Sequence, residues 1–138
     1  MERTLLCEIV TPERIIYTNE VRMVVAPTID GEIGILPLHA PLVSALKAGE
    51  IRVRYGNDEV EWFAVSGGYV QVHMDKVIIL ADQAVVASQV DVERARKAME
   101  LTQQRLAELP RDAEGEITSC EQELKWCEIQ VEVARKRD

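Results

Sequence analysis

The chain has 138 residues, of which 47% are hydrophobic, and its formal net charge is −8. This length supports one compact core with room for a small appendage. An acidic chain repels phosphate groups, so the composition argues against a nucleic-acid partner. No apolar run approaches the roughly 18 residues that a membrane-spanning helix needs. The N-terminal residues resemble neither a signal peptide nor a transit peptide, so we expect a cytoplasmic protein that reaches a membrane only through a partner.

Three cysteines, Cys7, Cys120 and Cys127, occur without a CxxC spacing. Their odd number argues against a disulfide framework, and their spacing argues against a zinc site. If Cys120 and Cys127 share a helix, they lie about 10 Å apart, because each residue adds about 1.5 Å. A disulfide needs Cα atoms within about 7 Å, so we expect three reduced, partly buried thiols.

Residues 1–87 contain short apolar or alternating segments separated by turn residues. Ile51, Val53 and Tyr55 alternate with arginines, and Gly-Asn-Asp follows at residues 56–58. This pattern predicts a half-buried strand that ends in a hairpin turn. The expected strands cover residues 5–10, 15–17, 21–26, 51–55, 60–64, 70–74 and 77–80, with turns at 11–13 and 75–76. Strands at this spacing predict an antiparallel β-sandwich or flattened barrel.

After residue 89 the apolar residues follow a helical period. Two stretches carry apolar or small residues at the same 3-4-3-4-3 spacing, and a polar break at 110–115 separates them. The first series is Val92, Ala95, Met99, Thr102, Leu106 and Leu109, and the second is Ile117, Cys120, Leu124, Cys127, Val131 and Ala134. Two such helices predict an antiparallel αα-hairpin over residues 88–138. The predicted fold class is therefore α+β, a β-sandwich followed by a two-helix hairpin.

Four apolar residues of the predicted hairpin lie off this narrow seam. They are Leu101, Trp126, Ile129 and Val133. Each needs a second surface, which either the sandwich or a partner protein supplies. The short polar joint at 87–89 permits motion between a domain at 1–87 and the hairpin at 88–138.

Candidate catalytic residues are few. His39 and His73 are the two histidines, and the strand pattern places His73 on a solvent-facing side. No serine or cysteine stands in a known nucleophile motif, and no set of residues has metal-ligand spacing. Gly67 and Gly68 lack the lysine of a phosphate-binding loop and predict a bulge or sharp strand bend instead. We therefore expect neither catalytic residues nor a metal site.

Residues 31–41 form the most distinctive segment, Gly-x-x-Gly-x-Leu-Pro-x-His-x-Pro. Two glycines three positions apart permit a tight turn. Pro37 and Pro41 flank His39 and keep it out of a regular strand ladder. We expect a rigid surface loop here, and an ordinary connector is the alternative.

The same segment resembles the N-terminal signature of ATP synthase epsilon subunits. Residues 65–70, Val-Ser-Gly-Gly-Tyr-Val, are similar to the strand-bulge-strand motif of that family. Residues 80–84, Leu-Ala-Asp-Gln-Ala, resemble its last strand, and residues 90–95, Val-Asp-Val-Glu-Arg-Ala, resemble the opening of its first C-terminal helix. All four motifs occur in the family's order, and the resemblance covers the whole chain.

The resemblance implies a non-catalytic subunit of the central stalk of a proton- or sodium-translocating ATP synthase. In this family the sandwich binds the gamma subunit and rests on the ring of c subunits, while the catalytic sites lie on beta subunits. The segment 31–34 is then implied to face the c-ring, and His39 with its flanking prolines is implied to lie at the gamma interface. The implied interface residues are Gly31, Glu32, Ile33, Gly34, His39 and Pro41.

A regulatory ATP is a further implication of the resemblance. Asp91 and Arg94 match the family's Asp-x-x-Arg-Ala element, which helps to bind ATP in some bacterial members. A triphosphate needs several cations, and residues 123–130 of the second helix offer only Lys125. The alternative is that Asp91 caps the first helix and Arg94 pairs with an acidic neighbour. No cofactor is required under either interpretation.

The hairpin is the regulatory part of this family, and it blocks ATP hydrolysis when it extends along gamma. An inhibitory second helix usually presents basic residues to a beta subunit, but the body of this helix is acidic. Arg135, Lys136 and Arg137 form a basic cluster at its end, which implies that any inhibitory contact with alpha and beta subunits depends on them. Cations at a helix C-terminus also complement the helix dipole, which is the purely structural alternative.

A free-standing β-sandwich adaptor is the alternative function, and copurification with gamma in a large ATPase separates the two. The resemblance implies a peripheral location at the cytoplasmic face of the cell membrane.

Overall fold

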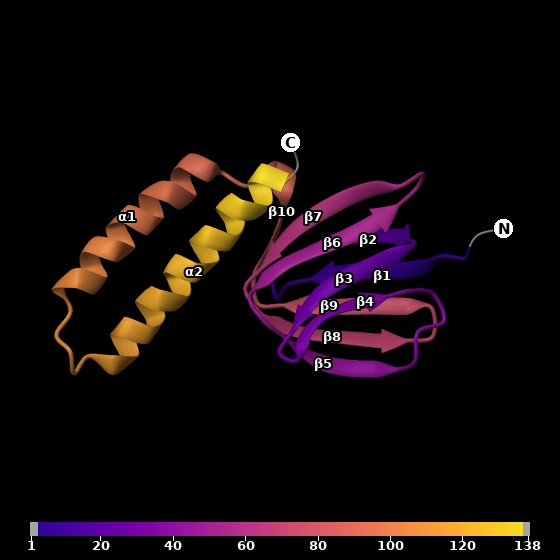
Figure 1. Cartoon of the computed structure of the whole chain (residues 1–138), viewed down its shortest axis with the longest axis horizontal. Coiled ribbons are helices and arrows are strands. Elements are labelled where there is room, and N and C mark those ends of the chain that lie inside the picture. The colour runs from indigo at the N-terminus through magenta and orange to yellow at the C-terminus, as the bar shows by residue number, and fades with distance from the viewer. Residues whose placement is uncertain (1–2, 137–138) are drawn as a thin grey trace.

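The structure, a computed structural model, describes residues 3–136. An N-terminal β-sandwich is followed by two long antiparallel helices, α1 (Val92–Glu108) and α2 (Glu114–Lys136) (Figure 1). This confirms the predicted α+β fold class. Within the described residues, no helix is long and apolar enough to cross a membrane.

Ten strands form the two layers of the sandwich in the described part of the chain. They are β1 (Leu5–Val10), β2 (Ile15–Val21), β3 (Met23–Thr28), β4 (Gly31–Ile35), β5 (Leu42–Leu46), β6 (Gly49–Tyr55), β7 (Glu59–Val65), β8 (Gly68–His73), β9 (Lys76–Ala81) and β10 (Ala84–Val86). One layer has the order β10-β7-β6-β3-β4, and the other has the order β5-β8-β9-β1-β2. The layers join where Thr28 of β3 pairs with Leu46 of β5.

The sandwich core is built from the inward-facing residues of both layers. Ile51 and Val53 of β6 are fully buried, as the alternation predicts, and Ile79 of β9 packs into the same cluster. Phe63 is the largest buried side chain, and its ring meets Tyr17 edge-on at a centroid distance of 4.9 Å. Such aromatic pairs add to the energy of apolar burial.

The structure corrects several predicted elements. The expected strand 21–26 is split at Arg22, and its two parts enter different layers. Residues 31–35, expected within a surface loop, form strand β4, because the reversal lies earlier, at Ile29 and Asp30. Strand β5 was not expected. The turn between β8 and β9 lies at Met74 and Asp75, one residue earlier than expected, and the last strand is β10 rather than residues 80–84.

The bend at Gly67 and Gly68 is confirmed, and it moves the chain from one layer to the other. Both glycines have positive φ, at 130° and 135°. A Cβ at Gly68 would collide with the carbonyl oxygen of Leu80. Glycine is therefore required here both for its backbone conformation and for the close approach of β9.

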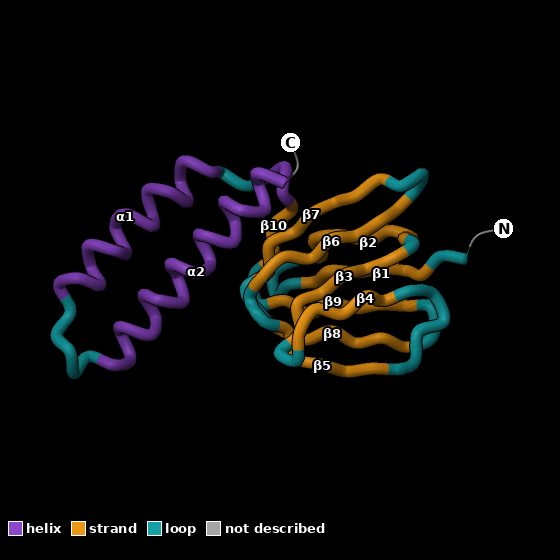
Figure 2. The backbone as a smooth tube through the Cα atoms, in the orientation of Figure 1, coloured by secondary structure: helices purple, strands orange, loops and turns teal. Residues whose placement is uncertain are grey.

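The two helices pack along the predicted seam. Ala95 and Thr102 of α1 are buried, as are Cys120 and Cys127 of α2. The hairpin loop ends two residues earlier than expected, because α2 begins at Glu114 and includes the glycine at 115. Helix α1 lies on the outside, and α2 separates it from the sandwich (Figures 1 and 2).

The C-terminal half of α2 docks on the sandwich. Ile129 and Val133 are buried against Ala64 of β7 and Ala87 of η1, a short 3-10 helix (Ala87–Gln89), in a cluster distinct from the main core. Trp126 packs on the edge of this cluster. The sandwich thus supplies the second surface that three of the four off-seam residues need, whereas Leu101 on α1 stays 67% exposed.

Candidate functional site

The glycine-containing segment 31–34 lies on the open edge of one layer. Strand β4 pairs with β3 on one side only. Gly31 has a φ of 115°, and nothing lies within 4 Å of a Cβ built on it. The Glu32 carboxylate accepts a hydrogen bond of 3.3 Å from the Arg52 guanidinium group. The edge therefore exposes backbone and one paired carboxylate to a partner.

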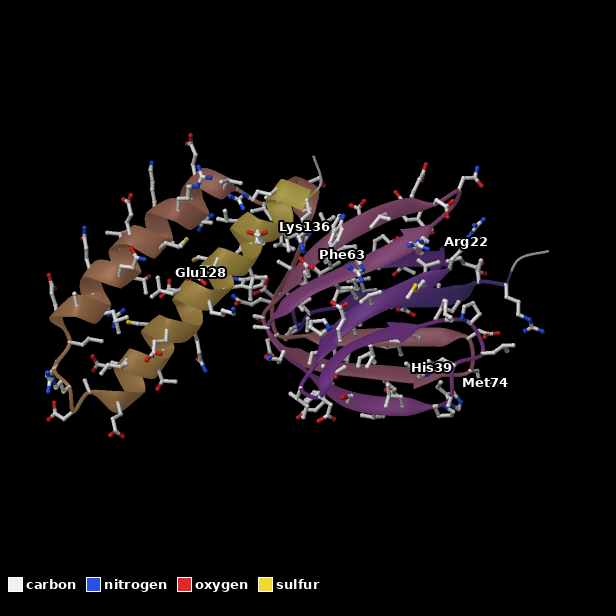
Figure 3. All side chains as sticks on the ribbon, viewed as in Figure 1. Arg22, His39, Phe63, Met74, Glu128 and Lys136 are labelled. Carbon is white, nitrogen blue, oxygen red and sulfur yellow. The ribbon has the colours of Figure 1, made fainter. Side chains whose placement is uncertain are left out.

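His39 lies in a loop at the other end of the sandwich, beside the β8–β9 turn (Figure 3). The amide of His39 donates to the carbonyl oxygen of Leu36 at 3.2 Å, which closes a turn. Leu38, with a φ of 67°, donates its amide to the Asp75 carboxylate at 3.0 Å. These bonds fix the loop, as the flanking prolines predict, and Pro41 leads directly into β5.

The structure does not bring the two groups of predicted interface residues together. Gly31 is near the end where Leu46 pairs with Gly68. His39 is near the end where Leu42 pairs with Val72. The two groups therefore lie on separate parts of the sandwich surface.

An apolar face on β5, β8 and β9 was missed by the sequence analysis. Ala45, Tyr69 and Leu80 lie in one cross-strand row, and Val43, Gln71 and Ile78 form the next, so the face is apolar except at the exposed Gln71. Val43 is 70% exposed, Tyr69 59% and Leu80 48%. We call this surface the Tyr69 face, defined by Val43, Ala45, Tyr69, Ile78 and Leu80. The unbroken apolar run at 77–80 was the available signal, since strands covered on both faces lose the alternating pattern.

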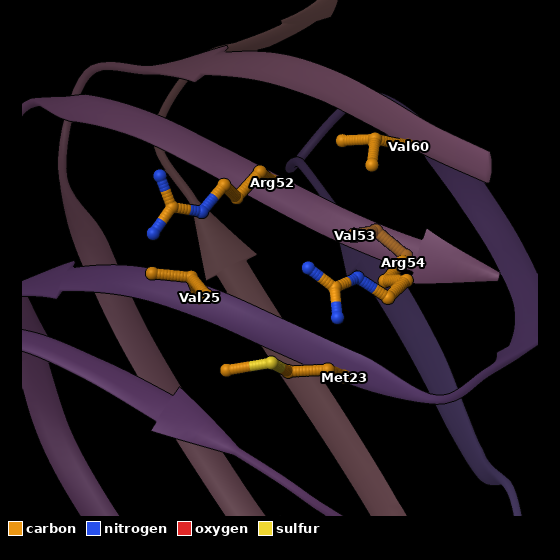
Figure 4. Close-up of a pocket in the computed structure, with 6 residues that line it drawn as sticks. All are labelled: Met23, Val25, Arg52, Val53, Arg54 and Val60. Carbon is orange, nitrogen blue, oxygen red and sulfur yellow. The ribbon is translucent and has the colours of Figure 1, made fainter. Parts of the chain in front are cut away.

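The outer face of the opposite layer differs in character (Figure 4). Arg52 and Arg54 of β6 extend over Met23, Val25 and their neighbours and leave a cavity of about 110 Å³. The aliphatic parts of the two arginines cover this apolar surface, which leaves Val25 only 6% exposed. This face is therefore largely covered by its own side chains.

The predicted nucleotide residues lie at the start of α1. Asp91 is the N-cap residue, and its carboxylate accepts a hydrogen bond of 3.1 Å from the backbone amide of Arg94. The predicted cap is therefore present. The Arg94 side chain is exposed, and a nearby hollow of about 210 Å³ is lined in part by Arg96 and Arg135.

The C-terminal basic cluster contacts the protein itself. Lys136 lies 2.6 Å from both carboxylate oxygens of Glu50 on β6 and 4.9 Å from the ring centroid of Trp62 on β7. Arg135 pairs with Glu132 on the helix surface at 3.3 Å. Arg137 lies outside the described residues.

The titratable groups of the interior belong to the cores. Burial raises the pKa of the Cys7 thiol to about 12, and it also raises the pKa of the Cys127 thiol. All three thiols are free and buried. Among residues 3–136, no group of three or more His, Cys, Asp or Glu side chains is arranged to hold a metal ion. His73 is exposed, as predicted.

A sandwich with one uncovered apolar face and a helical hairpin docked on its other layer defines a protein-binding subunit. Residues 4–87 match the family described as "ATP synthase, Delta/Epsilon chain, beta-sandwich domain". The chain is 49% identical over 106 residues to an ATP synthase epsilon chain of Desulforamulus reducens, covering 77% of this chain and 80% of the relative. It is 40% identical over 131 residues to that of Dehalococcoides mccartyi, covering 94% and 91%. The chain belongs to the ATP synthase epsilon chain family.

Two solved structures share the fold. A chain in the cryo-EM structure of the Euglena gracilis mitochondrial ATP synthase, OSCP/F1/c-ring, matches with a TM-score of 0.78 over 96% of this chain and 81% of that chain, at 24% identity. A chain in the central stalk/c-ring structure of the Tetrahymena thermophila mitochondrial ATP synthase has a TM-score of 0.66 over 96% and 98%, at 14% identity. At these identities the likeness establishes the fold, a sandwich followed by a helical hairpin.

Proposed function

We propose that this chain is a non-catalytic subunit of the rotor of an ATP synthase, which links the rotation of the c-ring to the catalytic head through gamma. The uncovered Tyr69 face is the observation that supports this proposal most directly. Its three most exposed apolar side chains lie on adjacent strands, and large exposed apolar patches mark protein interfaces. The fixed His39 loop leads into β5 and extends the same surface, so gamma is the proposed occupant of both.

The c-ring is the proposed partner of the β4 edge. Gly31 and Gly34 place backbone at the surface, and Glu32 is a carboxylate already oriented by Arg52. Short polar loops approach such an edge without steric hindrance. Because the β4 edge and the His39 loop lie at different ends of the sandwich, gamma and the c-ring are able to bind at the same time.

A charge on the Tyr69 face tests the proposal. Tyr69→Asp should abolish copurification of the subunit with gamma and uncouple ATP hydrolysis from ion pumping, because a buried unpaired charge is costly at an interface. Val60→Asp is the matched control, since Val60 is 40% exposed on the opposite outer face. If Tyr69→Asp assembles and couples like Val60→Asp, gamma binds elsewhere.

The hairpin is the proposed regulatory part, and it contacts alpha and beta subunits when it leaves the sandwich. Its removal should then raise ATP hydrolysis by the assembled enzyme. The complex is proposed to hold the subunit at the cytoplasmic face of the cell membrane.

We propose further that no nucleotide is required and that Asp91 serves as a helix cap. Its engagement with the Arg94 amide supports this role. Calorimetry of the isolated subunit with ATP tests it. Binding tighter than about 1 mM, equivalent to about −4 kcal/mol, that is lost in Arg94→Ala would contradict the proposal.

A further inference from the structure

The hairpin is attached to the sandwich over a small part of its length. The apolar contact consists mainly of Ile129 and Val133 on Ala64 and Ala87. Nearer the middle of α2, a groove of about 580 Å³ separates the helix from the sandwich, and Trp126 forms one of its walls. Helix α1 adds little to the attachment, because α2 lies between it and the sandwich (Figure 1). The remaining contacts at the C-terminal end of α2 therefore have a large influence on docking.

A charged contact completes this attachment at the last described turn. Lys136, labelled at the end of α2 in Figure 3, donates to both carboxylate oxygens of Glu50 and lies over the Trp62 ring. We call this the Lys136 contact, defined by Glu50, Trp62 and Lys136. Its charged side chains are only 34% and 24% exposed, for Lys136 and Glu50 respectively. Partial desolvation strengthens both the ion pair and the cation–π interaction beyond those of a fully exposed pair.

The neighbouring Arg135 provides a contrast. It pairs with Glu132 on its own helix, at 3.3 Å, and its side chain is 71% exposed. That pair is present whether or not the hairpin is docked. Of the two described cations of the C-terminal cluster, Lys136 is thus the one whose ion pair joins the hairpin to the sandwich.

We propose that the Lys136 contact holds the hairpin on the sandwich, and that Lys136 thereby opposes inhibition instead of causing it. The second part rests on the proposed function, in which the released hairpin inhibits. This effect of Lys136 on ATP hydrolysis is opposite to the effect that the basic cluster implies from the sequence. Removing the charge of Lys136 should release the hairpin, and ATP hydrolysis should fall.

Docking can be measured in the isolated full-length subunit with Trp126 as the probe. Trp62→Phe keeps an aromatic ring, and so a weaker cation–π contact, beneath Lys136, and it leaves Trp126 as the one tryptophan of the chain. Ten residues at about 1.5 Å each separate Trp126 from Lys136. Acrylamide quenching of Trp126 then reports release rather than local uncovering. In this background, Lys136→Met and Glu50→Gln should each raise the ratio of released to docked hairpin about fivefold.

Two further variants make the result specific. Arg135→Met removes a charge one position away and should leave quenching unchanged. The exchange Glu50→Lys with Lys136→Glu should restore docking, because it re-forms the pair with reversed polarity. Equal quenching of the Trp62→Phe protein and of the Lys136→Met and Glu50→Gln variants made in it would overturn the Lys136 contact as a docking determinant.

ATP hydrolysis by the assembled enzyme separates this inference from the proposed function. Lys136→Met in the otherwise unchanged chain should lower hydrolysis, whereas an enzyme whose subunit ends at residue 87 should hydrolyse ATP at least as fast as the parent enzyme. Increased quenching with unchanged or increased hydrolysis would leave the contact established but refute inhibition by the released hairpin. Failure of the subunit to copurify with gamma would refute the rotor function without affecting the quenching result.

Discussion

Cys7 shows how a single buried thiol makes stability depend on pH. It lies fully buried on β1 within the sandwich core, and burial raises its pKa from 9.0 to about 12. The folded protein therefore keeps this proton while the unfolded chain loses it above pH 9. The stabilisation is complete below pH 9 and is lost as the pH rises toward 12, at about 1.4 kcal/mol per pH unit.

Urea unfolding between about pH 8 and pH 11 checks this prediction. The free energy of unfolding should fall with pH in the parent, and it should fall less steeply in Cys7→Ala. The difference between the two slopes isolates Cys7 from the tyrosines, whose titration affects both proteins. Parallel slopes would contradict the assigned pKa.

Gly68 is the second residue with a specific physical requirement. A Cβ at this position meets the Leu80 carbonyl oxygen, and its φ of 135° disfavours any other residue. Gly68→Ala should therefore destabilise the sandwich by about 3 kcal/mol, since both overpacking and backbone strain contribute.

Gly115→Ala is the control for Gly68→Ala. Gly115 lies in the first turn of α2, and a Cβ added there would meet no atom within 4 Å. Alanine there should stabilise the helix by up to about 1 kcal/mol. Chemical denaturation measures the free energy of unfolding of both variants. A Gly68→Ala protein as stable as the parent would show that β9 moves to accommodate the added Cβ.

At the scale of elements, the cap of α1 gives a measurable prediction. The Arg94 amide loses its acceptor in Asp91→Ala, which should destabilise the hairpin by about 1 kcal/mol. Asp91→Asn retains an acceptor and should cost only a fraction of this. Thermal unfolding followed by helical circular dichroism compares the two, and equal losses would indicate that the negative charge rather than the cap is important.

Element types were predictable wherever one face alone is buried. The predictions from the alternation on β6 and from the seam of the two helices were correct because each element buries one face and exposes the other. The strand at residues 60–64 was also predicted, as β7, but its core-facing side was not, because Phe63 faces the sandwich core and Ala64 faces α2, so that both sides are apolar. The element type was wrong at β4, which has two glycines and a turn before it rather than within it.

The candidate site was predictable only as a set of residues. Gly31 and His39 belong to one segment of eleven residues in the sequence. In the structure, strand β4 runs from one end of the sandwich toward the other and so separates them. The contact of Lys136 with Glu50 joins residues 86 positions apart. No local pattern encodes such a pair, since it depends on how the hairpin folds back.

At the scale of the whole molecule, the two apolar clusters are separate, and this separation predicts how a chain without the hairpin behaves. The main cluster contains residues of the sandwich only, while the cluster around Val133 joins the sandwich to α2. A chain that ends after Ala87 should therefore keep its core, join the assembled enzyme and support coupled ion pumping. Copurification with gamma and ATP-driven pumping are the measurements, and a truncated subunit that is absent from the complex would contradict it.

The place of β1 in the sandwich has a consequence for the order of folding. Although it is the first strand to be synthesised, β1 lies between β2 and β9 and pairs with β9 in parallel, Leu6 beside Lys76. The second layer is therefore incomplete until nearly all of the sandwich has left the ribosome. Contacts this distant in sequence form slowly, whereas a helical hairpin with local contacts forms quickly. The surface on which α2 docks belongs to the first layer, where β6 and β7 pair across a short turn, so the hairpin is able to dock before β1 has paired with β9.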